Sequence, residues 1–132
     1  MIAVLDASAA IKIILKQSSV IELSGHLKRA DWVIAPDIFV SEVTNVYWKY
    51  HQFENLPLKI CADALQRTIE LIDDCIKAED LYREAFSFSC QVNHSVYDSM
   101  YLICARRYDA LLLSVDNKLI QLARKHSLKL LG

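Results

Sequence analysis

The stretch Ile2-Ala3-Val4-Leu5-Asp6-Ala7-Ser8 decides how the rest of this sequence is interpreted. Its four apolar residues end at once in Asp6, and residues at helical spacing follow over 7–16. A short, continuous apolar run is typical of a strand that is buried on both faces, as in parallel sheets. The chain therefore begins with the pattern of a strand followed by a helix, with a carboxylate where the strand ends.

The same alternation recurs along the whole chain. Further strands are predicted over residues 32–35, 68–72 and 110–115, and residues 128–131 fit an edge strand. Helices are predicted between them, with a break at 17–19, over residues 7–16, 19–29, 36–53, 58–67, 77–90, 94–107 and 117–126. Strands that alternate with helices predict a parallel sheet with helices on both faces, in a single domain spanning residues 1–132.

Composition limits the classes of protein that remain. The chain has 132 residues, 54% of them apolar, with only 2 glycines and 2 prolines. This length is enough for one domain with its own core, and the scarcity of turn formers argues against an all-β sandwich. The formal net charge of −1 excludes a globally basic nucleic-acid coat, although a local basic rim is still compatible with it.

The sequence also carries signals about location. No apolar run reaches the ~18 residues of a membrane span, and the first residues lack the basic leader of a signal peptide. The four cysteines have neither CxxC nor zinc-site spacing, so we expect them to act as small buried hydrophobic residues. These features predict a cytoplasmic protein in a reducing compartment, without a membrane partner.

Asp6 and Asp116 each come directly after a predicted buried strand. In open α/β sheets, ligands gather at the carboxyl ends of the strands, near the point where the strand order reverses. The two carboxylates could therefore lie side by side in one crevice. The alternative is that each one caps the helix that follows, because aspartate is a favourable N-cap residue.

Glu42 and Asp98 each lie on the apolar stripe of a predicted helix. Glu42 stands four residues after Ile38 and four before Val46, and Tyr101 and Leu102 follow Asp98 at helical spacing. A carboxylate that faces a core must be paired, protonated or bound to a metal, because burying an isolated charge is costly. The alternatives are a structural ion pair or a residue at the edge of the stripe that reaches water.

Taken together, Asp6, Glu42, Asp98 and Asp116 are four acidic groups that could converge. Four carboxylates at one site repel each other unless a cation lies between them. Hard divalent cations such as Mg²⁺ and Mn²⁺ prefer oxygen ligands. Such acidic clusters recur where these ions activate water and clamp a phosphodiester.

The motifs that carry these acids resemble, in order, the four motifs of PIN-domain ribonucleases, and the likeness covers the whole chain. It is nearest to the VapC toxins of toxin–antitoxin pairs. The matching stretches are Val4-Leu5-Asp6-Ala7-Ser8, Pro36-Asp37-Ile38 leading to Glu42, Val96-Tyr97-Asp98-Ser99-Met100-Tyr101-Leu102, and Leu113-Ser114-Val115-Asp116.

The resemblance implies a PIN-like three-layer α/β/α sandwich with a central parallel sheet of four or five strands, and endonucleolytic RNA cleavage that depends on Mg²⁺ or Mn²⁺. By motif, it implies that Asp6, Glu42, Asp98 and Asp116 form the catalytic and metal site. Ser8, Ser114 and Asn117 would support that site through hydrogen bonds. It further implies a homodimer and a cognate antitoxin that occupies the substrate groove.

Cationic guides for the RNA phosphates are expected on helices near the acids or on the rim of the site. The candidates are Lys12, Lys16, Arg106, Arg107, Lys118, Arg124 and Lys125. For each of them the alternative is an ordinary solvated helix surface.

Two other functions stay open at this stage. One is a non-catalytic PIN-like scaffold that binds RNA. The other is a phosphoacceptor receiver domain, which needs paired acids after its first strand and a lysine at the end of a late strand. Asp6 has no paired acid after its strand, and no lysine fits at a strand end.

Overall fold

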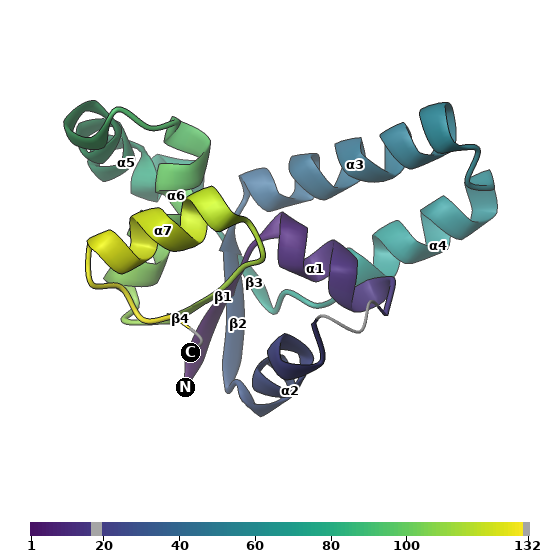
Figure 1. Cartoon of the computed structure of the whole chain (residues 1–132), viewed down its shortest axis with the longest axis horizontal. Coiled ribbons are helices and arrows are strands. Elements are labelled where there is room, and N and C mark those ends of the chain that lie inside the picture. The colour runs from purple at the N-terminus through teal and green to yellow at the C-terminus, as the bar shows by residue number, and fades with distance from the viewer. Residues whose placement is uncertain (17–19, 131–132) are drawn as a thin grey trace.

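The computed structural model describes residues 1–16 and 20–130, and these form a parallel four-stranded sheet between two groups of helices (Figure 1). This confirms the predicted α/β/α architecture. The strands are β1 (Ile2–Leu5), β2 (Trp32–Pro36), β3 (Asp74–Ile76) and β4 (Leu111–Leu113), in the order β3-β2-β1-β4. Leu130 adds one isolated parallel bridge to Leu112, in place of the expected edge strand. The predicted break at 17–19 and residue 131 lie outside the described residues.

The path of the chain places a switch point at β1. The described helices are α1 (Ala7–Ile14), α2 (Ile21–Arg29), α3 (Ile38–Glu54), α4 (Leu58–Ile69), α5 (Ala78–Val92), α6 (Val96–Arg107) and α7 (Asn117–Lys125). The connections that contain α1 to α4 lie on one side of the sheet, and α5 and α6 return the chain on the other side (Figure 1). The carboxyl ends of β1 and β4 therefore meet at the point where a ligand crevice is expected.

The core is built on β1 and on α6. Residues 3–5 of β1 are completely buried between the helix layers, as the continuous apolar run predicts. Residues 101–105 of α6 are buried as well, and this helix packs on β1, β2 and β4. Because α6 starts at the carboxyl ends of the strands, its first turn brings Asp98 toward the same edge of the sheet as Asp6.

The strand predicted over residues 68–72 is wrong, because α4 continues to Ile69 and β3 comes later, at Asp74–Ile76. The Thr68 hydroxyl donates to the carbonyl of Ala64, one turn earlier in the helix (2.7 Å). β3 has only three residues and begins with Asp74, a residue type that is depleted in strands, so its sequence signal is weak. Its approach is fixed instead by Asp73, whose carboxylate accepts from the backbone N–H of Val33 (2.8 Å).

The helix predicted over 36–53 begins two residues later than expected. Pro36 ends β2 instead of starting α3, and Ile38 is the first residue of that helix. The Asp37 carboxylate does not cap its own helix and accepts instead from the backbone N–H of Ala78 at the start of α5 (3.3 Å).

The cysteines divide into two classes. Cys61 and Cys104 are buried as predicted, whereas the prediction is wrong for Cys75 and Cys90, which are exposed. Among the described helices, none is both long and apolar enough to cross a membrane.

Candidate active site

Asp6 directly follows β1 at the carboxyl edge of the sheet, where the strand order reverses between β1 and β4 and a ligand crevice is expected. Leu5 pairs with Leu113, and the backbone N–H of Asp6 continues the ladder to the Leu113 carbonyl (3.1 Å). This register places the Asp6 side chain beside Ser114, which follows β4. The side chain is only 5% exposed, although it carries a carboxylate.

The Asp6 carboxylate is held by three donors. Ser114 Oγ donates to Oδ2 (2.5 Å), and Ser8 Oγ and the backbone N–H of Ala9 donate to Oδ1 (2.8 and 2.9 Å). Burial nevertheless raises the pKa of Asp6 to about 6, and the nearby charge of Asp116 adds to that rise while the hydrogen bonds oppose it. At neutral pH, Asp6 is therefore a buried anion held at a cost in free energy.

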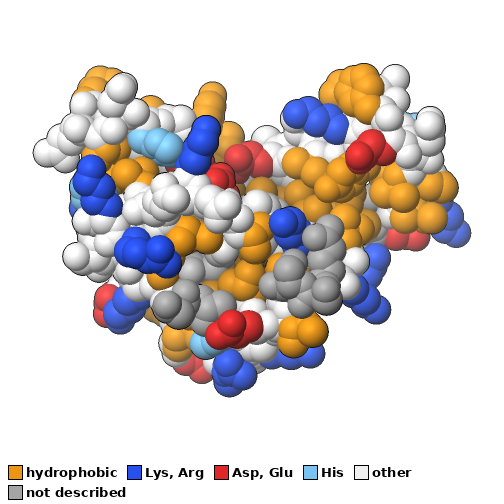
Figure 2. All heavy atoms as spheres, viewed as in Figure 1, with side chains coloured by type: hydrophobic (Ala, Val, Ile, Leu, Met, Phe, Trp, Pro, Cys, Tyr) orange, Lys and Arg blue, Asp and Glu red, His pale blue; other side chains and the backbone are white. Residues whose placement is uncertain are grey.

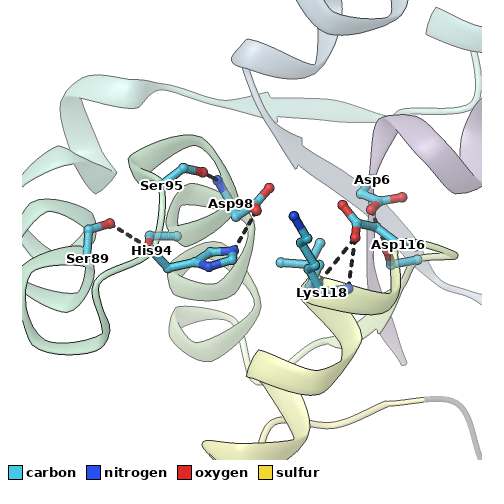
Figure 3. A network of polar contacts seen from close by, with 10 residues as sticks. Asp6, Ser89, His94, Ser95, Asp98, Asp116 and Lys118 are labelled. Carbon is cyan, nitrogen blue, oxygen red and sulfur yellow. Dashed lines mark hydrogen bonds and ion pairs between the residues drawn. The ribbon is translucent and has the colours of Figure 1, made fainter.

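Asp116 lies beside Asp6 (Figure 3). The prediction that Asp116 directly follows a strand is wrong, because β4 ends at Leu113 and Asp116 comes three residues later. Its backbone N–H donates to Ser114 Oγ (3.0 Å), and its Oδ1 accepts from the backbone N–H groups of Lys118 and Leu119 (3.0 and 3.4 Å). Asp6 and Asp116 are thus both N-caps, of α1 and α7. The capping and the crevice interpretations hold together, because one carboxylate can cap a helix and still face its neighbour.

Glu42 projects from α3 and is half-buried on the apolar stripe, as its spacing predicts. Tyr101 Oη donates to Glu42 Oε1 (2.6 Å). Burial raises the pKa of Glu42, the Tyr101 hydrogen bond lowers it, and the charge of Asp98 raises it. The pKa of the buried Tyr101 phenol is itself raised by burial first, and then by the charges of Glu42 and Asp6. Tyr101 therefore lies within electrostatic range of both carboxylates.

Asp98 has a histidine partner, which none of the other three acids has among the described residues. His94 Nε2 lies 2.7 Å from Asp98 Oδ2, one helical turn away, and both side chains are partly exposed. Asn93, with a φ of 54°, ends α5, and Ser95 Oγ accepts from the backbone N–H of Asp98 (3.2 Å) at the start of α6. The turn between the two helices thus holds both partners in place.

The expected convergence of four carboxylates is only partly met. The electrostatic couplings join Asp6 to Asp116 and Glu42 to Asp98. Over residues 1–16 and 20–130, however, no three His, Cys, Asp or Glu side chains lie close enough to hold a metal ion together. The acids form two coupled pairs rather than one cluster, and each of the four side chains has a local hydrogen-bond partner.

The donor set is chemically suited to a hard divalent cation. All four side chains offer carboxylate oxygens, the ligands that Mg²⁺ and Mn²⁺ take. Within the described part of the chain, Asp6, Glu42 and Asp116 form no ion pair with lysine, arginine or histidine. The pair Asp6–Asp116 is the better fit, because a cation there would neutralise a buried anion.

Only some of the predicted supporting residues and cations lie near Asp6. Ser8 and Ser114 contact Asp6 as expected, whereas Asn117 is exposed in the first turn of α7. The prediction that Arg106 and Arg107 lie near the site is wrong. They are at the far end of α6, where Arg106 stacks on Phe88 and Arg107 binds Glu84.

Lys118 lies differently from those arginines. Its ammonium points toward the space between Asp98 and Asp116 (Figure 3). In the space-filling view, acidic side chains occupy the middle of one face, with histidine and lysine or arginine side chains directly beside them (Figure 2).

Sequence reasoning missed the roles of Tyr101 and His94. The helical pattern assigns Tyr101 only to an apolar stripe, and His94 only to the start of a helix. A tyrosine three residues after an inward aspartate, and a histidine four residues before it, carry the signal, because both spacings place polar groups on the face of the acid.

Comparison with known proteins adds a family and a fold. A family model described as the PIN domain matches residues 3–125. The crystal structure of PAE2754 from Pyrobaculum aerophilum is similar with a TM-score of 0.73 and 16% identity, over 92% of this chain and 86% of that one. A search of curated proteins found no match.

Proposed function

The chain belongs to the PIN-domain family, and we propose that it is an endoribonuclease that depends on Mg²⁺ or Mn²⁺. PIN domains are generally nucleases. The observation that carries the proposal is Asp6, a buried carboxylate beside Asp116 at the switch point of the sheet. Such an anion is stabilised by a bound cation, and a cation at a strand end is placed to meet a phosphodiester.

The residues that would hold the ion are Asp6 and Asp116, with Asp98 and Glu42 on the helices facing them. When bound, the ion would lower the pKa of a water molecule and offset the negative charge of the phosphodiester in the transition state. The chain itself keeps the carboxylates oriented. Ser114 and Ser8 fix both oxygens of Asp6, and Tyr101 fixes Glu42.

The strand order and the burial of Asp6 also argue against the two alternative functions, the receiver domain and the non-catalytic RNA scaffold. The strand order β3-β2-β1-β4 differs from the 2-1-3-4-5 order of receiver domains. A non-catalytic RNA scaffold would not need a buried carboxylate whose pKa is raised to about 6. Hydrolysis of RNA is therefore the function that the site supports best.

The finer assignment is that the chain is the cytoplasmic toxin of a toxin–antitoxin pair and forms a homodimer. The motif likeness supports the toxin. A protein partner is supported by an apolar hollow of about 230 Å³ on α3 and α4, where Trp48 and Leu58 are largely exposed. Expression in a heterologous bacterium tests the toxin, and wild type should inhibit growth while Asp116→Asn does not. Equal inhibition by both would contradict toxicity through this site.

The nuclease proposal is tested by incubating the full chain with total RNA in Mn²⁺ and in chelator. Asp6→Asn and Asp98→Asn should each lower cleavage at least about 100-fold in Mn²⁺, because losing even a supporting partner of a metal site can reach that size. Asp63→Asn, an exposed carboxylate on α4, is the matched control and should cleave normally. Circular dichroism checks the fold. Undiminished cleavage in chelator or by Asp6→Asn would contradict the proposal.

A further inference from the structure

A hollow lined by basic side chains lies next to the acidic crevice. It has a volume of about 430 Å³ and lies between α7 and the turn that joins α5 to α6. Its lining residues are His94, Lys118, Gln121, Leu122 and Lys125. The hollow shares His94 with the Asp98 ion pair, so it continues directly from the candidate active site.

The α7 residues of the hollow form one face of that helix. Positions 118, 121, 122 and 125 are spaced by three, four and seven residues, which aligns them along the axis. The opposite face carries Leu119 and Ala123, both fully buried against the core. The cations are therefore displayed outward by a helix whose packing does not depend on them.

Lys118 and Lys125 are cations without a carboxylate partner in the described part of the chain. Asp116 is near Lys118, but its carboxylate takes the backbone N–H groups of α7 instead. The Lys118 ammonium points between Asp98 and Asp116 (Figure 3). It is thus available to an anion that enters the crevice.

We propose that this face of α7 binds the backbone of the RNA substrate on one side of the cleaved bond, an inference that rests on the proposed ribonuclease function. Lys118 binds a phosphate at the edge of the crevice, and Lys125 binds a second one further along. Their α-carbons are about 10.5 Å apart along the helix, two turns from each other. Gln121 lies between them and can donate to the backbone of the strand.

The overall charge of the chain explains why this basic face of α7 is needed. The chain has a net charge of −1, and the crevice itself presents carboxylates that repel phosphate. Local cations must therefore hold the strand beside the acids. An acidic protein segment would meet the same lysines, but the continuity of the hollow with the crevice favours the substrate strand.

The test is binding of a labelled 12-nucleotide single-stranded RNA by fluorescence anisotropy, in chelator, over a range of KCl concentrations. Removing one lysine that neutralises a phosphate should reduce the slope of log K against log[salt] by about 0.7 for a single strand. Lys118→Ala and Lys125→Ala should each show that reduction. Lys59→Ala removes an exposed charge on α4, outside the hollow, and should leave the slope unchanged.

The outcomes separate this inference from the proposed function. Equal slopes in all three variants would overturn the inference, even if wild type cleaves RNA in an Asp6-dependent manner. Polyglutamate serves as the acidic protein segment in the same assay. If the two lysine variants bind polyglutamate more weakly but bind RNA as wild type does, the inference is also overturned. If the slopes change as expected but the chain does not cleave RNA, the RNA-binding face of α7 is supported and the proposed ribonuclease function is contradicted.

Discussion

Asp6 and Asp98 face the same crevice but are held in opposite ways. Asp6 is buried at the strand ends, with neutral hydroxyl and amide donors, and its pKa is raised to about 6. Asp98 is partly exposed on α6 and has His94 as a partner. Asp6 is therefore a buried anion without a basic partner, whereas Asp98 is partly exposed with a histidine beside it. A cation should therefore matter most at Asp6.

The largest effect on stability is expected for Asp6→Asn in chelator. A carboxyl group whose pKa is raised in the folded state costs no folding free energy below its unfolded pKa near 3.8. This cost grows as the pH rises and reaches its full value above about pH 6. The shift of about two units corresponds to roughly 3 kcal/mol. The free energy of unfolding of Asp6→Asn should therefore rise relative to that of wild type by about that amount between pH 4 and pH 7.5. Urea unfolding measures this difference.

Two controls accompany that experiment. Asp63→Asn, on the exposed surface of α4, should follow wild type at every pH. Mn²⁺ should stabilise wild type more than Asp6→Asn, because stabilisation follows affinity for the folded state. A variant that loses stability relative to wild type as the pH rises would show that Asp6 is not a strained anion.

A smaller effect, this time a loss of stability, is expected for Tyr101→Phe, because Tyr101 holds Glu42. The substitution removes the hydrogen bond to Glu42 Oε1 and should cost about 1–2 kcal/mol, because Glu42 keeps some access to water. It should also raise the pKa of Glu42, since that hydrogen bond lowers it. Carboxyl titration by NMR measures the shift. An unchanged pKa of Glu42 would contradict the positioning role of Tyr101.

Asp98→Asn should have a still smaller effect and the opposite sign to Asp6→Asn. A partly exposed pair contributes about 0.2–1 kcal/mol, so the free energy of unfolding should fall slightly when the pair with His94 is broken. A double-mutant cycle with His94→Gln isolates the pair. A gain in stability would mean that repulsion from Glu42 outweighs the pair and that the two halves of the site are alike.

The sequence predicts the fold well because its strongest signals are local. The apolar run over 2–5 and the stripe around Glu42 both lie where the pattern predicts them, since burial on two faces or on one stripe leaves a clear period. β3 is the exception. Its position is set by Asp73 and Asp74, which bond to Val33 and Trp32, and such side-chain contacts have no period.

The site is predicted less completely than the fold. Placing Asp6 and Asp116 at strand ends needs only the order of elements, and their coupling follows from neighbouring strands. Whether four acids reach one another depends on side-chain donors in three dimensions. Tyr101 holding Glu42 and His94 holding Asp98 decide that point, and neither bond can be read from spacing alone.

The smallest expected effect compares the two serines that hold Asp6. Ser114 donates to Oδ2 at 2.5 Å and Ser8 to Oδ1 at 2.8 Å, and Ser114 lowers the pKa of Asp6 more than Ser8 does. Shorter hydrogen bonds to a charged acceptor are stronger. The pKa of Asp6 should therefore rise in the order wild type, Ser8→Ala, Ser114→Ala.

Carboxyl titration of Asp6 by NMR in chelator measures this order, with the exposed Ser87→Ala on α5 as a control that should match wild type. The rise deepens the strain at Asp6, so both serine variants should also lose stability above pH 6 but not near pH 4. Ser114→Ala has a second consequence, because Ser114 Oγ also accepts from the backbone N–H of Asp116. If Ser8→Ala shifts the pKa more, Asp6 is organised from α1 rather than from β4, and the coupling between the two strand ends is weaker than their geometry implies.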